Sequence, residues 1–263
     1  MPFVRISGTL LHYRLTGPEG APPLVFVNSL GTDARIWDAV IAALSDRYRC
    51  LSYDKRGHGL SDAPDGDYAL DNHLDDLEGL LDQLRLNKGT VIGVSVGGLI
   101  AQGLALRAPH RVAALVLCCT APRMGDVAMW AARIETARTK GLETMADPVM
   151  ERWFSPDFRQ HRPDELAGWR NLFLRTNPLG YANTCATLRD TDLSADIAQI
   201  EAPTLIVAGG ADLAAPVDLV RNCTAIPGSR FEVLDGVGHI PSIERPARLA
   251  GLIQDFLKEA DHG

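Results

Sequence analysis

Short apolar segments alternate with longer amphipathic segments along most of this chain, and this alternation limits the folds open to it. Strands are expected at residues 3–6, 10–15, 24–28, 49–54, 90–94, 114–118, 204–208 and 231–234, and helices at 36–44, 70–84, 96–107, 217–226 and 246–259. The first two strands flank Ser7-Gly8-Thr9, which suits a hairpin turn. The later strands are apolar throughout, as in parallel sheets covered on both faces. The pattern predicts an α/β protein with a mostly parallel, eight-stranded sheet flanked by helices.

The alternation stops between about residues 122 and 189, where helical patterning is punctuated by prolines and no strand is convincing. This segment also holds three of the four tryptophans, Trp130, Trp153 and Trp169. We therefore expect a helical cap, or lid, over one end of the sheet, formed by residues 122–189, and a core formed by residues 1–121 and 190–263. Extra helices packed on a face of the sheet are the alternative.

A strand meets a helix at Ser95, within the sequence Gly93-Val94-Ser95-Val96-Gly97. This is a G-x-S-x-G match, and in a strand–turn–helix context it produces a sharp turn that exposes the serine above the carboxyl end of the strand. The amide groups at the start of the helix also favour developing negative charge. The context makes Ser95 a candidate nucleophile rather than part of a structural glycine turn.

A serine hydroxyl needs a base, and this fold places the base last, after the nucleophile and an acid. Four histidines follow Ser95, namely His110, His161, His239 and His262. Only His239 lies in a loop between the last strand and the last helix, where it could return over the sheet. His239 is therefore the candidate base, and a solvated loop histidine is the alternative.

The acid should follow a strand that lies beside the nucleophile strand. Asp212 lies in a glycine-containing loop after the strand at 204–208, whereas residues 119–121, after the preceding strand, include no carboxylate. Asp235 is too near His239 in sequence to reach it from a neighbouring strand. Asp212 is therefore the candidate acid, although it could instead cap the helix that follows.

An oxyanion needs two preorganised N–H donors. One should be Val96, after the nucleophile, and the other should be Leu30 or Ser29, in the loop after the strand at 24–28. Asn28 precedes this loop and could stiffen it through its side chain.

The sequence "DKRGHGLSD" places His58 between two glycines, but His58 precedes the nucleophile in the chain. We expect this loop to be structural, with Asp54 paired to Arg56 and His58 hydrogen bonded.

Composition excludes several other classes of function. The formal net charge of −7 and the pI near 5.5 argue against nucleic acid or an anionic membrane as the main partner. The five scattered cysteines show no metal or redox spacing, and we expect most of them to be small buried residues. No run of about 18 apolar residues and no signal-like start is present, so a cytoplasmic protein is expected.

The motifs "GVSVGG", "DKRGHGLS", "GGADLAAP" and "GVGHIPSIERP" together resemble those of the α/β-hydrolase family. The sequences "VFVNSLGTDARIWD" and "LVLCCTAPRMG" look like those of the 3-oxoadipate enol-lactonases, with "NSLGT" as the most discriminating feature. This resemblance implies an eight-stranded α/β-hydrolase fold and hydrolysis of an anionic enol lactone to 3-oxoadipate in aromatic catabolism. It also implies an acyl-enzyme with no metal or organic cofactor. Carried over by position, the nucleophile is Ser95, the base is His239, the acid is Asp212, and the oxyanion donors are Leu30 and Val96.

A substrate that is an anion needs a local cation in a protein of net negative charge, and arginine suits a carboxylate through its two-pronged geometry. The helical segment supplies Arg123, Arg133, Arg138, Arg152, Arg159, Arg162, Arg170 and Arg175. Arg133 is favoured because it lies at helical spacing from Trp130, and Trp130 and Trp153 could exclude water from the site.

Other functions remain open on this fold. A generic small-ester hydrolase or a cofactor-free perhydrolase would keep the same three residues and would prefer a neutral aryl ester to the anionic lactone. A ligand receptor with an intact triad would show slow turnover and a change in the lid on binding. Oligomeric state is left open by the sequence.

Overall fold

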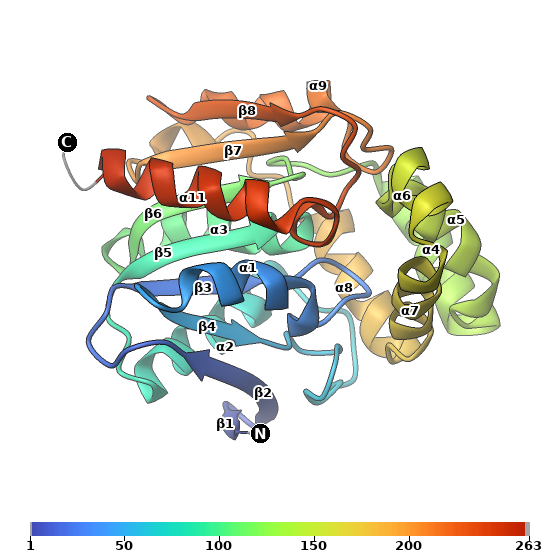
Figure 1. The fold of residues 1–263 in the computed structure, drawn as a ribbon. Coiled ribbons are helices and arrows are strands. Elements are labelled where there is room, and N and C mark those ends of the chain that lie inside the picture. The colour runs from blue at the N-terminus through green and yellow to red at the C-terminus, as the bar shows by residue number, and fades with distance from the viewer. Residues whose placement is uncertain (1, 261–263) are drawn as a thin grey trace.

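The computed structural model describes residues 2–260, which form one eight-stranded sheet with helices on both faces (Figure 1). The strand order is β1-β2-β4-β3-β5-β6-β7-β8. The strands are β1 (Phe3–Ile6), β2 (Thr9–Thr16), β3 (Pro23–Val27), β4 (Arg49–Tyr53), β5 (Gly89–Val94), β6 (Val112–Cys118), β7 (Thr204–Gly209) and β8 (Arg230–Leu234). The first two form the expected hairpin, β2 runs antiparallel to β4, and all later pairs are parallel. The predicted mostly parallel sheet is confirmed.

Helices cover the two faces of this sheet and bury apolar side chains against it. One face is covered by α1 (Asp38–Leu44) and α11 (Pro246–Ala260), which contact each other, and the other by α2 (Leu70–Gln83) and α3 (Val96–Arg107) (Figure 1). The central strand β5 is buried along its whole length, and α3 is buried for most of its length. The core therefore lies around the β5–α3 connection, and this packing holds Ser95 in place.

Five helices between β6 and β7 lie beyond the carboxyl ends of the strands, at the right of Figure 1. They are α4 (Val127–Lys140), α5 (Glu143–Trp153), α6 (Pro156–His161), α7 (Pro163–Leu174) and α8 (Pro178–Asp190). We call them the helical segment. Of these five, α8 lies nearest the sheet and packs on α4. This placement puts aromatic and basic side chains above the strand ends.

Two predicted helices begin or end differently from the sequence pattern. The segment 36–44 starts as a 3-10 helix, Ala34–Trp37, whose first turn is capped by the Asp33 carboxylate before α1 begins. The segment 217–226 is α9 (Val217–Val220) followed by the 3-10 helix Arg221–Ala225. There the Thr224 hydroxyl donates to the Arg221 carbonyl at 2.7 Å, and such local bonds compete with regular helix. After β8 come the short helix α10 (Pro241–Glu244) and the long helix α11. Within residues 2–260 no helix is long and apolar enough to cross a bilayer.

Candidate active site

Ser95 lies at the turn between β5 and α3 in a conformation that few non-glycine residues adopt. Its φ is 60° and its ψ is −123°, and backbone in such a region costs about 1–3 kcal/mol unless its surroundings enforce it. Here the Ser95 N–H donates to the Cys118 carbonyl at 3.0 Å, and the Ser95 carbonyl accepts from the Gly98 N–H at 2.9 Å. The turn is therefore fixed from the neighbouring strand and from the helix.

Two glycines make this turn possible by letting backbone segments touch. A Cβ atom at Gly93 would lie 2.2 Å from the Gly97 carbonyl oxygen, and one at Gly97 would lie 2.2 Å from that of Val27. No side chain fits at either position. The start of α3 thus rests directly on the ends of β3 and β5, as the G-x-S-x-G motif requires.

The structure brings Asp212 and His239 together from the loops after β7 and β8. The His239 Nδ1 lies 2.8 Å from the Asp212 Oδ2, and both side chains are buried. The other oxygen, Oδ1, accepts from the N–H groups of Ala214 and Ala215 at 2.7 and 2.9 Å. These bonds orient the carboxylate, which in turn keeps the proton on Nδ1 and leaves Nε2 free to accept one.

The residues rejected at the sequence level lie elsewhere. His110 is exposed in the 3-10 helix Pro109–Arg111, and His161 is exposed on α6 beside Asp157. His262 lies outside the described residues. Asp235 is exposed on the turn after β8.

Ser95 and His239 line one small cavity of about 110 Å³ beneath the helical segment. Leu30 lies in its wall on the side of the sheet. The helical segment contributes Trp130, Trp153, Arg133 and Arg152, together with Tyr181 and Met129. Met124 lines the cavity from the loop just before α4. The predicted nucleophile and base therefore share a cavity with the predicted aromatic wall and two cations.

The backbone N–H groups of the two predicted oxyanion donors, Leu30 and Val96, are not used in other hydrogen bonds of the described residues. Leu30 lines the cavity, and Val96 begins α3 immediately after Ser95. Amide groups held without a partner beside a nucleophile are suited to a developing oxyanion.

The loop that carries Leu30 is held by three side chains. The Asn28 side chain donates to the Thr32 carbonyl, and the buried Lys55 ammonium donates to the Ser29 carbonyl. The His58 Nε2 accepts from the Gly31 N–H at 2.9 Å, so its proton is on Nδ1, which lies 3.2 Å from the Arg56 carbonyl. Burial, and then the charge of Lys55, hold the pKa of His58 well below its ordinary value. His58 is thus a neutral acceptor that positions this loop.

One expectation about the neighbouring loop is wrong. Asp54 does not pair with Arg56. The Asp54 carboxylate accepts from the Ala34 and Leu60 N–H groups and lies 2.9 Å from the His12 Nδ1. Arg56 instead forms a two-pronged ion pair with Asp76 of α2, at 2.7 and 2.8 Å. The reason is that the Asp54 carboxylate already has hydrogen-bond partners from the surrounding loops and β2. Arg56 instead reaches Asp76, whose carboxylate would otherwise be buried without a partner.

Arg133 and Arg152 are the two arginines of the helical segment that line the cavity. Within residues 2–260 neither has an acidic partner. Arg133 lies over the Trp130 ring at 5.6 Å, as its spacing suggested, and burial followed by the charge of Arg133 lowers the pKa of Arg152. Arg152 was not singled out by sequence, although it directly precedes Trp153. Two partly buried guanidinium groups without counter-charges favour an anionic ligand.

Cys119 lies beside Asp212 and His239, and one donor atom from each of these three residues falls within 4.8 Å of the others. A metal needs the thiolate form of cysteine. Burial, and then the charge of Asp212, raise the pKa of the Cys119 thiol well above its ordinary value. The Cys119 thiol donates to the Gly238 carbonyl at 3.8 Å, and the Asp212 and His239 atoms of this cluster lie 2.8 Å apart, so all three groups have partners within the protein. All five cysteines are buried, as expected.

Glu244 of α10 joins the loop of His239 to the helical segment, and sequence reasoning missed it. Its Oε1 accepts from the Gly238 N–H at 2.9 Å and from the Ser155 N–H at 3.1 Å, and its Oε2 accepts from the Ser155 hydroxyl at 2.6 Å. Beside these bonds, the His239 N–H donates to the Trp153 carbonyl at 2.8 Å. Glu244 is therefore a positioning residue that fixes the backbone on either side of the candidate base.

Replacing Glu244 by alanine is expected to lower kcat about 10²-fold, since two buried N–H groups lose their acceptor and the loop of His239 can shift. The free energy of unfolding should fall by about 2–4 kcal/mol. Glu244→Gln is the matched control, because its amide can accept both N–H groups and donate to the Ser155 hydroxyl. Kinetics on any hydrolysed ester would check this, and an alanine variant with wild-type kcat, or a glutamine variant equally impaired, would contradict it.

The difference in stability between the wild type and Glu244→Gln is expected to depend on pH. Burial raises the pKa of Glu244, so the folded state favours the protonated form. The stability that this group contributes is therefore fully present below the ordinary pKa of a glutamate, about 4.3, and is lost as the pH rises through its folded pKa. Glu244→Gln does not lose stability in this way, because the glutamine side chain does not ionise. Urea unfolding between pH 4 and 8 should show the glutamine variant gaining stability relative to the wild type as the pH rises, and a constant difference would contradict the expectation.

Comparisons with known proteins identify a family and several related enzymes. Residues 22–246 match the family described as the alpha/beta hydrolase fold. Two enzymes of Acinetobacter baylyi, 3-oxoadipate enol-lactonase 1 and 3-oxoadipate enol-lactonase 2, are 36% and 33% identical to this chain. The alignments cover 96% and 98% of this chain, and 94% and 99% of those proteins. The crystal structure of the enol-lactonase from Burkholderia xenovorans LB400 is 40% identical, with a TM-score of 0.95 over 98% of this chain and all of that one. The chain belongs to the α/β-hydrolase family.

Proposed function

We propose that this protein hydrolyses 3-oxoadipate enol-lactone to 3-oxoadipate. The observation that carries the proposal is that Ser95, His239 and two arginines line the same cavity, and that neither arginine has an acidic partner within residues 2–260. The similarity to three enol-lactonases over nearly the whole chain supports the same substrate class. The substrate is an enol lactone that carries a carboxylate arm, so one cavity must serve both an ester carbonyl and an anion.

In the first half of the proposed reaction, His239 accepts the Ser95 hydroxyl proton on Nε2 while the serine oxygen attacks the lactone carbonyl. Asp212 stabilises the imidazolium that forms. The negative charge on the former carbonyl oxygen is taken up by the N–H groups of Leu30 and Val96. When the intermediate collapses, the ring C–O bond breaks and the proton on His239 passes to the departing enol oxygen.

The enol is a good leaving group, since it becomes a ketone by tautomerisation, and the demand on His239 as an acid is modest. The ring-opened chain stays attached to Ser95 as an ester. In the second half, His239 removes a proton from water, which attacks this ester and regenerates the serine. The sum is one lactone and one water giving one 3-oxoadipate, with no oxidant, reductant or cofactor.

The carboxylate arm is assigned to Arg133 and Arg152, and residues 122–189 are assigned as a lid. Trp130 and Trp153 would close over the reacting carbonyl and exclude bulk water, which strengthens the electrostatic contacts inside. We place the reaction in the aromatic catabolism of the cytoplasm. The alternative, a small-ester hydrolase or a cofactor-free perhydrolase, would use Ser95, Asp212 and His239 but would have no use for the two unpaired arginines.

Arg133→Ala and Arg152→Ala should each raise the KM for the lactone at least about tenfold, the value of a charge-assisted hydrogen bond, and change kcat little. Neither should affect the KM for a neutral ester such as 4-nitrophenyl acetate. Steady-state assays on both substrates would check this. The wild type should also show a higher kcat/KM for the lactone than for the ester.

Arg123→Ala is the matched control, because Arg123 also belongs to residues 122–189 but pairs with Asp192 at the surface, 3.1 Å away. It should leave both KM values unchanged. If Arg133→Ala and Arg152→Ala leave the KM for the lactone unchanged, other residues must bind its carboxylate. The proposed reaction itself would not be contradicted by that result. A higher kcat/KM for the neutral ester would instead favour the generic esterase.

A further inference from the structure

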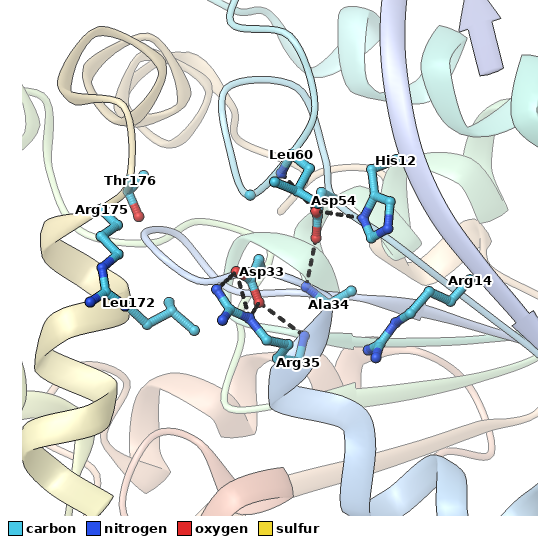
Figure 2. A pocket seen from close by; sticks show the side chains of 11 residues that line it. His12, Arg14, Asp33, Ala34, Arg35, Asp54, Leu60, Leu172, Arg175 and Thr176 are labelled. Atoms are coloured by element: carbon cyan, nitrogen blue, oxygen red, sulfur yellow. Dashed lines mark hydrogen bonds and ion pairs between the residues drawn. The ribbon is translucent and has the colours of Figure 1, made fainter. Parts of the chain in front are cut away.

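A second cavity lies on the other side of the loop that carries Leu30. It measures about 380 Å³ and shares no lining residue with the cavity of Ser95. Its walls come from four places in the chain: β2, the segment after β3, the loop after β4 and the end of α7 (Figure 2). These walls include Arg14, Arg35, Leu60, Leu172 and Arg175. The proposed reaction makes no use of this space.

The charges around this second cavity favour an anion. Arg14 pairs with Asp38, and Arg35 pairs with Asp33. Arg175 is exposed at the end of α7 and has no acidic partner within residues 2–260. The buried Asp54 carboxylate at the back of the cavity is already bonded to two N–H groups and to His12 (Figure 2). One guanidinium is therefore left to bind a carboxylate from solution.

The same walls favour an apolar body attached to that carboxylate. Leu60 is 52% exposed beside the cavity, and Leu172 lines it from α7. An adjoining hollow of about 310 Å³ shares Arg35, Leu172 and Arg175 and adds the partly exposed ring of Trp169. An apolar wall beside one arginine that has no acidic partner within residues 2–260 is typical of a ligand site rather than of ordinary surface.

We propose that this cavity, which we call the α7 site, binds a small amphiphilic organic anion, with its carboxylate on Arg175 and its apolar ring between Leu60, Leu172 and Trp169. Its volume lies within the range of small-molecule pockets. The site is independent of the enol-lactonase proposal, because no residue is common to the two cavities.

The test is isothermal titration calorimetry with 2-naphthoate as the probe. We expect one molecule bound at the α7 site, with a Kd that rises at least about tenfold in Arg175→Gln and severalfold in Leu60→Ser. Two controls should bind the probe as the wild type does. Arg170→Gln removes an arginine of the same helix that pairs with Asp147 and Glu143, and Arg133→Gln removes a cation of the other cavity.

Both changed residues are exposed, so the variants should fold, and thermal unfolding would confirm it. The proposal is overturned if 2-naphthoate does not bind at millimolar concentration, or if Arg175→Gln binds it as tightly as the wild type. Loss of binding in Arg133→Gln would also overturn it, because the probe would then occupy the cavity of Ser95. If Leu60→Ser binds 2-naphthoate as tightly as the wild type, the proposed apolar contact with the ring is wrong.

Discussion

Replacing Ser95 by alanine is expected to lower kcat for the enol lactone about 10⁵-fold or more, since the hydroxyl that forms the proposed acyl-enzyme is removed. The residual rate should come from the two unpaired amides and from substrate binding, which the substitution leaves in place. Alanine keeps the Cβ atom, so the strained turn at position 95 is unchanged, and the melting temperature should stay close to that of the wild type. Steady-state kinetics and thermal unfolding would check both statements.

Covalent labelling tests independently whether Ser95 is a nucleophile or has only a structural role. A fluorophosphonate should attach covalently to the wild type at Ser95, as mass spectrometry of its peptides would show, and should not label Ser95→Ala. If Ser95→Ala keeps kcat within tenfold of the wild type, the assignment of Ser95 as the nucleophile is wrong. Labelling at another residue in the wild type would do the same.

Replacing Asp212 by asparagine should lower kcat about 10⁴-fold while changing the KM little. The asparagine side chain can present its amide to the His239 Nδ1, which then becomes the acceptor and carries no proton. The proton moves to Nε2, and the ring can no longer accept one from Ser95. The loss of negative charge also removes the stabilisation of the imidazolium. Steady-state kinetics of the wild type and of Asp212→Asn, measured from pH 5 to 10, would check both expectations.

Asp235→Asn is the matched control for Asp212→Asn. Asp235 is closer to His239 in sequence, but it is exposed on the turn after β8, so its replacement should leave kcat unchanged. If Asp235→Asn were the damaging change and Asp212→Asn were harmless, the acid would have to be reassigned.

Most of the fold could be predicted because its signals are local. Apolar strands, helical stripes and glycine turns gave all eight strands within a few residues of their ends. The details that failed depend on competition between neighbouring groups. Asp33 caps a 3-10 turn before α1, and the Thr224 hydroxyl bonds its own backbone where a longer helix was expected. Neither effect changes the hydrophobic pattern, so the pattern could not indicate it.

The candidate acid and base were predictable because chain order constrains them. Order along the chain singled out Asp212 and His239, and the structure places them 2.8 Å apart. Pairings between distant segments have no such signal. The bond from Glu244 to Ser155 joins residues 89 positions apart, and Arg152 faces the cavity because α5 turns it there. Its position next to Trp153 was the one available hint.

The carbonyl of Trp153 accepts from the backbone of His239, and the Trp153 ring walls the cavity. The end of α5 thus forms part of the cavity wall and also supports the backbone that carries the imidazole. If that helix swings outward to admit a molecule, the hydrogen bond must break or the imidazole must follow. Substrate entry and proton transfer by His239 could then not occur at the same time. The rate at which α5 returns would become an upper limit on kcat, whatever the intrinsic reactivity of the lactone.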